Sequence, residues 1–150
     1  MTTTQENLQV AAKSTTQESL QVVKQLYAEL GQGNMQAVLD LMVDDIIWEV
    51  TGPTEVVPWL GKRQGREQVS KYFNQINETV GIISFDLQEM VAQDDKVMAL
   101  IQEKSYCKAT NRTYGSAFAH LFIVSEGKIA RFYAVLETAP IVAAFLDRDL

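Results

Sequence analysis

The chain contains a single histidine, His120, which lies in the apolar segment FAHLFIV at positions 118–124. Histidine titrates near neutral pH, so this residue is the first candidate for moving a proton or for donating a hydrogen bond to an oxyanion. A histidine in such a segment can also be a core residue that hydrogen-bonds a neighbouring group and does nothing else. Both interpretations stay open. In either case, burial among apolar side chains lowers the pKa of the imidazole, because the charged form loses hydration.

A catalytic histidine usually has an orienting partner, and Glu103 on the neighbouring strand is the natural candidate. The loop between the two strands decides the geometry. With an even loop, such as residues 111–112, Glu103 and His120 lie directly opposite each other on one face of the sheet. With an odd loop, Glu103 points to the other face. The alternative is that Glu103 is a solvated or interface carboxylate that pairs with Lys104 or Lys108.

The remaining chemistry-bearing residues argue against several kinds of site. Cys107 lies near the end of a predicted hairpin, with no helix N-terminus to activate its thiol, and we interpret it as structural. One histidine, one cysteine and no carboxylate cluster at ligand spacing predict that the chain has no metal site. The segment GKRQGR at 61–66 lacks the residue order of a phosphate-binding loop. We expect neither a metal nor a cofactor.

Length and charge limit the partners. A chain of 150 residues forms one ordinary domain, and its formal net charge of −6 argues against nucleic acid as a partner. No apolar run is long enough to span a bilayer. The N-terminal residues MTTTQENLQV lack the basic start and the apolar stretch of a signal peptide. We therefore predict a cytoplasmic protein that binds neither a membrane nor nucleic acid.

A short repeat marks the start of the domain. The segment TTQENLQV at 3–10 returns as TTQESLQV at 15–22, and each copy has Thr three residues before Glu, the capping-box pattern of a helix start. Apolar residues at spacings of three and four continue the second copy into a helix that ends at GQG, 31–33. The first copy is less apolar. We interpret 1–14 as an N-terminal extension and 15–150 as a single domain.

The rest of the chain predicts an α+β fold. Helices are expected after Asn34 and after Gly65, and a short C-terminal helix is expected from Thr138. Five segments rich in β-branched and aromatic residues are predicted strands. These segments are 46–50, 83–92, 96–109, 113–124 and 128–137. The order of these elements predicts a curved antiparallel sheet with helices on one face.

The strand at 113–124 is apolar on both faces. Phe118, His120 and Phe122 share one face, and Leu121 belongs to an equally apolar second face. An antiparallel sheet with one face in water alternates polar and apolar residues, so both faces of this strand are expected to be covered. The predicted helices suffice for one face only. We therefore predict a homodimer through the sheet.

Three segments carry a resemblance to a known family. They are VVKQLYAELGQGNMQAVLDLMVDDIIWEV at 22–50, PWLGKRQGREQVSKYF at 58–73 and YGSAFAHLFIVSEGKIARFYAVLET at 114–138. They resemble the opening helices and first strand, the Gly-x-x-x-Gly-Arg-Glu segment before the third helix, and the closing hairpin of the nuclear transport factor 2-like superfamily. The resemblance covers roughly 17–138. It implies the cone-shaped, cystatin-like fold of ketosteroid isomerase, scytalone dehydratase and the SnoaL-like polyketide cyclases, with an internal pocket.

The catalytic residues of ketosteroid isomerase do not all carry over. Its general base, an Asp in the first strand, corresponds to Val50, and Glu49 beside it points to the other face. Its oxyanion Tyr corresponds to Leu26, with Tyr27 one step around the helix. Its second oxyanion donor, an Asp, corresponds to His120. The resemblance therefore implies the fold of this enzyme and not its mechanism.

By resemblance, an apolar and aromatic set of side chains lines the pocket. The set is Leu26, Trp48, Val50, Trp59, Phe73, Phe118, Phe122, Phe132, Ala134 and Leu136. Such a lining suits a hydrophobic, cyclic small molecule held by one or two polar contacts. If the protein is an enzyme, we expect cofactor-free isomerisation, cyclisation or dehydration in which His120 moves the proton. The alternatives are a non-catalytic carrier or sensor, and a partner-binding scaffold whose pocket is filled by its own side chains.

Overall fold

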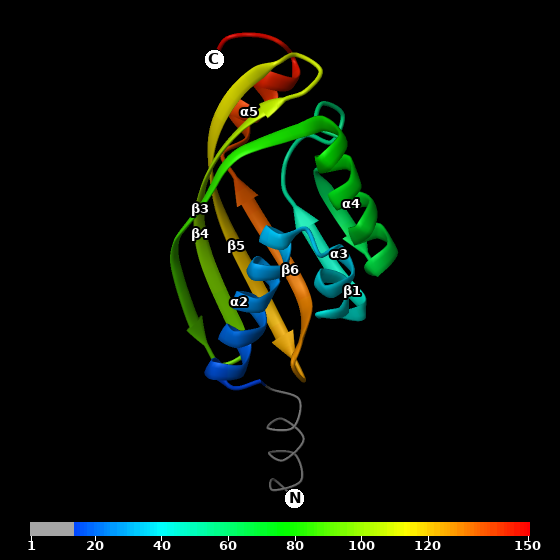
Figure 1. Cartoon of the computed structure of the whole chain (residues 1–150), viewed down its shortest axis with the longest axis vertical. Helices are drawn as coiled ribbons and strands as arrows, with labels where there is room; N and C mark the ends of the chain where they lie inside the picture. Colours follow the sequence, from blue (N-terminus) through cyan, green and yellow to red (C-terminus); the bar gives the residue numbers. More distant parts are fainter. Residues whose placement is uncertain (1–13) are drawn as a thin grey trace, which may run out of the picture.

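The structure, a computed structural model, describes residues 14–150, so the first copy of the repeat and the predicted extension up to position 13 lie outside the described residues. The described chain forms one curved six-stranded sheet with helices packed against it (Figure 1). In chain order the elements are α2 (Thr16–Gln32), α3 (Met35–Asp40), β1 (Met42–Val50), β2 (Gly61–Gln64), α4 (Arg66–Thr79), β3 (Val80–Gln93), β4 (Lys96–Cys107), β5 (Arg112–Ser125), β6 (Lys128–Leu136) and α5 (Thr138–Phe145).

The capping box predicted from the second copy of the repeat is present at the start of α2. The Glu18 amide donates to Thr15 Oγ1 at 3.1 Å, and the Thr15 amide donates to Glu18 Oε1 at 3.0 Å. The helix ends at Gly33, whose φ of 71° is the left-handed conformation that closes many helices. Its buried residues Ser19, Val23 and Leu26 follow the helical spacing and face the sheet. The sequence therefore determines both ends of α2 and the face that it buries.

The sheet has the order β2-β1-β6-β5-β4-β3. The predicted α+β fold with a curved sheet is confirmed, and β3 to β6 form the predicted antiparallel series. Two details differ from the prediction. β1 pairs with β6 in parallel. A parallel pair needs a long connection, and the elements from β2 to β5 supply it. β2, the GKRQ segment, is not among the five predicted strands; it contains no apolar residue, and it pairs antiparallel with β1 at the sheet edge.

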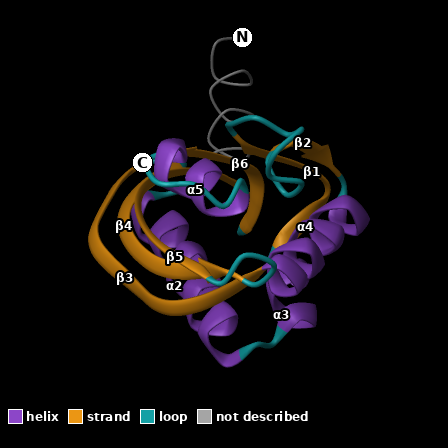
Figure 2. Cartoon of the chain, turned by 90° about the horizontal axis from the view of Figure 1, so that it is seen from above, coloured by secondary structure: helices purple, strands orange, loops and turns teal. Residues whose placement is uncertain are grey.

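The helices lie on the concave face of the sheet. Seen from above, the sheet curves around one side of the molecule while α2, α3 and α4 close the other (Figure 2). Helix α2 contacts β3, β4, β5 and β6, and α4 contacts β1, β2 and β3. Helix α5 contacts β4 and β5 near the end at which the chain terminates. The curvature thus leaves room for side chains between the inner sheet face and the helices.

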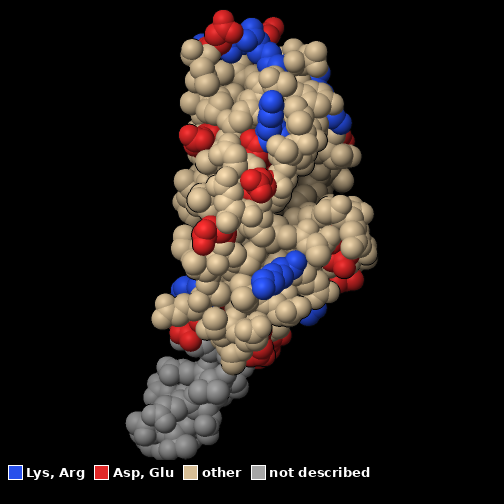
Figure 3. Space-filling view, turned by 60° about the vertical axis from the view of Figure 1, so that its left-hand side comes forward, with Lys and Arg blue, Asp and Glu red and all other residues tan. Residues whose placement is uncertain are grey.

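The outer face of the sheet carries exposed apolar residues between charged and polar ones, and no helix covers it among the described residues. Met98, Leu100 and Val135 expose 48%, 45% and 49% of their surface, and Leu121 between them is half-buried. On the side of the molecule that carries β3 and β4, uncharged residues dominate the surface (Figure 3). The prediction that the second face of 113–124 has no helix to cover it agrees with this arrangement.

Candidate functional site

A cavity of about 650 Å³ lies between the inner face of the sheet and the helices. Side chains from α2, α4, β1, β3, β4, β5 and β6 line it, and Trp59 reaches it from the loop between β1 and β2. All ten residues that the resemblance placed in a pocket are in its wall. The volume is in the range of cavities that hold small organic ligands. A space of this size also shows that the side chains of the protein itself do not fill the cone.

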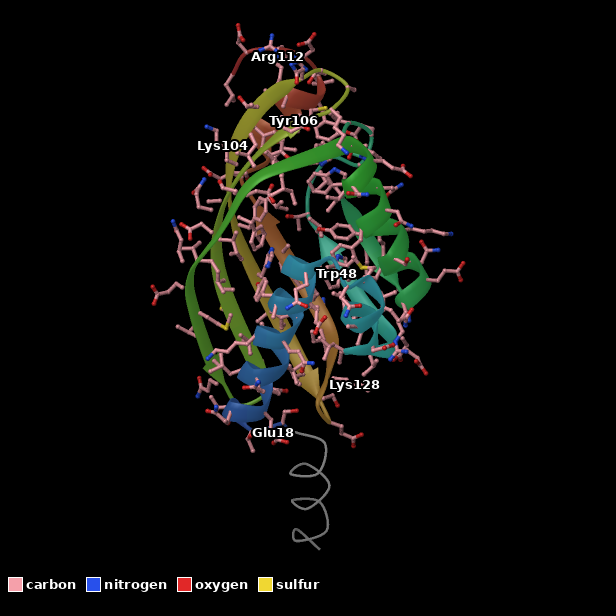
Figure 4. The ribbon with its side chains drawn as sticks, viewed as in Figure 1. Glu18, Trp48, Lys104, Tyr106, Arg112 and Lys128 are labelled. Atoms are coloured by element: carbon pink, nitrogen blue, oxygen red, sulfur yellow. The ribbon has the colours of Figure 1, made fainter. Side chains whose placement is uncertain are left out.

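Aromatic rings form much of the cavity wall. Trp48 stacks on Phe132 with ring centroids 3.9 Å apart, and Phe132 packs at 5.0 Å against Phe122. Trp48 also meets Tyr72 and Phe73 of α4 edge-on, each at 5.5 Å, so it lies between β1 and the helix that covers it (Figure 4). Rings held edge-on and face-on by their neighbours form a rigid, flat-sided apolar surface. Such a wall favours a planar ligand.

A tyrosine and the histidine form a hydrogen-bonded pair in this wall. The Tyr27 hydroxyl on α2 lies 2.9 Å from His120 Nδ1 on β5, and the two rings are nearly parallel, 8° apart. We refer to them as the Tyr27–His120 pair. The resemblance aligned Leu26 with an oxyanion tyrosine and placed Tyr27 one step around the helix. The side chains of Leu26 and Tyr27 both face the cavity, because adjacent helical residues near the centre of an apolar stripe share the buried side.

The rings around His120 determine its protonation state. The ring centroids of Phe118 and Phe122 lie 5.9 and 6.1 Å from that of His120. The centroid of Phe132, whose ring meets the imidazole edge-on, is closer, at 4.8 Å. Burial in these surroundings lowers the pKa of His120 to about 3, because the imidazolium would lose its hydration. Burial raises the pKa of Tyr27 well above its ordinary value. Both members of the pair are therefore uncharged at neutral pH.

The pair has one hydrogen-bond donor to spare. A neutral imidazole and a phenol carry two exchangeable protons between them, and their mutual hydrogen bond uses one. If Tyr27 donates to Nδ1, His120 retains an Nε2–H. If Nδ1–H donates to Tyr27, the phenol proton is free and Nε2 presents a lone pair. In either tautomer the pair offers one N–H or O–H donor in a cavity that is otherwise largely apolar.

Glu103 does not lie opposite His120, which corrects the sequence-based arrangement. The hairpin loop is residues 108–111, so Glu103 pairs with Ser116 and His120 with Ala99. The loop is even, and both side chains face the cavity as the even case predicts. The loop is, however, centred two residues earlier in the chain than a loop at 111–112. The residue opposite Glu103 therefore changes by four positions, from His120 to Ser116, which is roughly 13 Å along the strands. The partner of the histidine is Tyr27, which the sequence analysis left in the apolar stripe of α2.

Glu103 is a buried carboxyl and not a surface ion. It is 8% exposed, while Lys104 lies on the outer side of the sheet and the Lys108 Nζ donates to the Asn77 carbonyl at 2.7 Å (Figure 4). The alternative, a pairing with Lys104 or Lys108, is therefore wrong. Burial raises the pKa of Glu103 to about 7, and the nearby Ser105 hydroxyl lowers it only in part. Its charge contributes to the raised pKa values of Tyr72 and Tyr114.

Residues 14–150 contain no group of three or more His, Cys, Asp and Glu side chains that could hold a metal ion. Cys107 is buried and free. None of the helices in the described part of the chain is both long and apolar enough to cross a membrane. The polar side chains that line the cavity are the Tyr27–His120 pair, Glu103 with Tyr72 and Tyr114, and a group from α4, β4 and the loop after β4. That group is Asn74, Asn77, Tyr106 and Lys108.

Comparisons with known proteins agree with the fold. The model of the SnoaL-like domain matches residues 23–132, and the chain belongs to this family. A nuclear transport factor 2-like protein from Burkholderia xenovorans LB400 is 26% identical over 87% of this chain and 98% of its own, with a TM-score of 0.80. A candidate isomerase from Rhodopseudomonas palustris is 24% identical over 87% and 97%, with a TM-score of 0.74.

A third solved structure is TerC co-crystallised with polyporic acid. It is 15% identical over 86% of this chain and 98% of its own, with a TM-score of 0.76. No curated protein matches the chain. The matches place the chain in the nuclear transport factor 2-like superfamily, as the sequence resemblance implies.

Replacing Glu103 with Gln is expected to stabilise the protein at alkaline pH and to leave it unchanged at acid pH. The pKa of Glu103 rises from 4.5 to about 7 on folding, so unfolding releases a proton between these values and the free energy of unfolding falls as pH rises through them. The amide cannot ionise, so the variant gains about 2–3 kcal/mol near pH 8. Urea unfolding of both proteins at about pH 4, below both pKa values, and at about pH 8 measures the difference.

Glu89→Gln on the exposed part of β3 is the matched control; it retains Glu103, so its stability should fall with pH as that of the wild type does. If Glu103→Gln and the wild type differed by the same amount at both pH values, burial would not hold the Glu103 carboxyl in its protonated form.

Proposed function

We propose that this SnoaL-like protein binds a flat, hydrophobic, cyclic small molecule in the cavity and that the Tyr27–His120 pair hydrogen-bonds a carbonyl oxygen of that molecule. The observation that carries the proposal is the uncharged pair, with its spare donor, in an aromatic cavity of about 650 Å³. A donor in such surroundings interacts strongly with a carbonyl oxygen, because little water competes for either group. The apolar walls supply the rest of the affinity.

The same contact supports cofactor-free acid–base chemistry. When a proton leaves the carbon next to a carbonyl, negative charge develops on the oxygen, and the hydrogen bond from the pair becomes stronger as the enolate forms. Isomerisation, aldol-type cyclisation and dehydration all proceed through such a species. In the tautomer in which Nδ1–H donates to Tyr27, the Nε2 lone pair can accept the proton, and His120 then returns it elsewhere on the ligand.

One observation favours a non-catalytic carrier or sensor as the second candidate. The β1 position that would hold a carboxylate base is Val50, and Glu49 beside it lies on the other face of the strand. Glu103 is displaced from the pair along the strand. His120 is then the base nearest the ligand carbonyl, and a pKa near 3 makes it a weak one. A binder needs only the hydrogen bond, whereas an enzyme needs proton transfer as well.

Removing the Tyr27 hydroxyl is expected to weaken binding of an aromatic ketone. Tyr27→Phe should lower the affinity for 2-acetylnaphthalene about 3- to 10-fold, the worth of one hydrogen bond, as measured by quenching of Trp48 and Trp59 fluorescence. Tyr133→Phe on the outer sheet face is the matched control and should bind as the wild type does. Equal affinities for Tyr27→Phe and the wild type would contradict the proposed contact.

His120→Gln separates the two candidate functions. Proton exchange at the methyl group of the same ketone, followed by NMR in deuterated water, reports enolate formation. An enzyme loses this exchange in the variant while it still binds the ketone. A carrier shows no exchange above the buffer rate in the wild type either.

We propose further that the protein is a homodimer through the outer face of the sheet. The exposed apolar residues of β4 and β6 on that face, among them Leu100, support this assembly, because monomers seldom leave a contiguous apolar surface in water. Continuous pairing of β4, β5 and β6 beneath these residues makes the face a rigid platform.

A charge at the centre of this face is expected to dissociate the dimer. Leu100→Glu should weaken association at least about 100-fold, because the carboxylate would be buried without a partner. Sedimentation velocity over a concentration series measures the change, and Gln64→Glu on the opposite edge strand is the charge control. A wild type that sediments as a monomer at all concentrations would contradict the assembly.

A further inference from the structure

A second polar cluster lies in the cavity, apart from the Tyr27–His120 pair. Glu103 and Ser105 of β4 and Tyr114 of β5 are all buried, and Ser105 is paired directly with Tyr114 across the strands. Tyr72 of α4 approaches from the helical side, where the charge of Glu103 raises its pKa. Trp59 packs on Tyr72 with ring centroids 6.4 Å apart. We refer to these residues as the Glu103 cluster.

The Glu103 cluster has hydrogen-bonding capacity that the protein does not use. The Tyr114 hydroxyl, the Ser105 hydroxyl and the Trp59 Nε1–H have no partner at hydrogen-bond geometry among residues 14–150, although the two hydroxyls are near enough to Glu103 and to each other to affect pKa values. Buried polar groups in native proteins nearly always have a partner. Tyr114 interacts with the buried Glu103 carboxyl, and Trp59 lies in the wall of the same cavity. Their unpaired hydroxyl and Nε1–H therefore indicate a site that is completed by another molecule.

The chemistry of the cluster selects one kind of group. The Glu103 carboxylate accepts hydrogen bonds, whereas the Trp59 Nε1–H only donates and the Tyr114 hydroxyl does both. A carboxylate on the ligand would be repelled by Glu103. An ammonium group would satisfy Glu103 but would leave the Trp59 donor without an acceptor. A hydroxyl group donates to Glu103 and accepts from Tyr114 or Trp59 at the same time.

We propose that the Glu103 cluster is a binding subsite for a ligand hydroxyl group, so that the cavity selects elongated planar molecules with a carbonyl at one end and a hydroxyl at the other. The inference rests on the proposed function, because the carbonyl end occupies the Tyr27–His120 pair. The offset of four residues between Glu103 and the position opposite His120, roughly 13 Å along the strands, sets the length of molecule that can reach both. Two fused rings with substituents at opposite ends have this form.

The test compares three probes that differ only at the end directed to the Glu103 cluster. They are 2-acetylnaphthalene, 6-acetyl-2-naphthol and the 6-methoxy ether of the latter, and their binding is followed by tryptophan fluorescence. The naphthol should bind the wild type about tenfold more tightly than the other two, because only its hydroxyl can donate to the carboxylate. The ether has a similar shape and lacks this donor, so it is the matched control ligand.

Variants then locate the preference. Glu103→Leu should bind all three probes with equal affinity, because no carboxylate remains to accept from the naphthol. Tyr114→Phe, a milder change, should lower the preference for the naphthol in part, which provides a second test if Glu103→Leu does not fold. Tyr27→Phe should weaken all three probes by the same factor and leave the preference intact.

The outcomes separate the two proposals. If the wild type binds 2-acetylnaphthalene but shows no preference for the naphthol, the hydroxyl subsite is refuted and ligand binding in the cavity stands. If the preference persists in both Glu103→Leu and Tyr114→Phe, the hydroxyl is recognised elsewhere and the subsite is equally refuted. If none of the probes binds the wild type, the proposed function fails for planar ketones, and the subsite fails with it.

Discussion

A hydrogen bond between Tyr27 and His120 joins helix α2 to strand β5 across residues that are 93 positions apart in the chain. It is the constraint on which the cavity depends, because an imidazole among phenylalanine rings has few other ways to satisfy its nitrogens. The bond fixes the orientation of both rings, and burial keeps the pair uncharged. A polar group that is held in place and uncharged can face an apolar cavity without drawing in solvent, and it can still offer one donor to a ligand.

The Tyr27–His120 pair and the Glu103 cluster differ in charge. Burial holds His120 neutral, whereas Glu103, with a pKa near 7, is poised to ionise at physiological pH. Aromatic residues form much of the cavity wall, and the ten lining residues predicted from the resemblance all lie in the three segments that resemble the family. This asymmetry gives the cavity a direction: one region suits a carbonyl oxygen, and the other suits a group that donates. A fold that hosts many chemistries becomes specific through such pairs of polar residues.

Local patterns in the sequence predicted most of the fold, and the family resemblance predicted the cavity wall. Alternation along 113–124 grouped the residues of β5 by face, because side chains in a strand alternate whatever the register, and the resemblance implied which face points inward. The register itself escaped prediction. Parity placed Glu103 on the correct face, but the position of the loop at 108–111 determines which residue lies opposite it. The pairing of Tyr27 with His120 also escaped, since it depends on how a helix lies across a sheet. A tyrosine inside an apolar stripe beside a lone buried histidine was the available signal.

The most direct measurement is the ¹⁵N NMR titration of His120, which is unambiguous because the chain has one histidine. A neutral imidazole bonded to Tyr27 predicts nitrogen shifts of one fixed tautomer that do not change between about pH 8 and pH 5, since the pKa is lowered to about 3. Addition of 2-acetylnaphthalene should then move these shifts in the wild type and much less in Tyr27→Phe. An imidazole that titrates near its ordinary pKa of 6.5 and ignores the ketone would contradict the buried pair and the ligand site built on it.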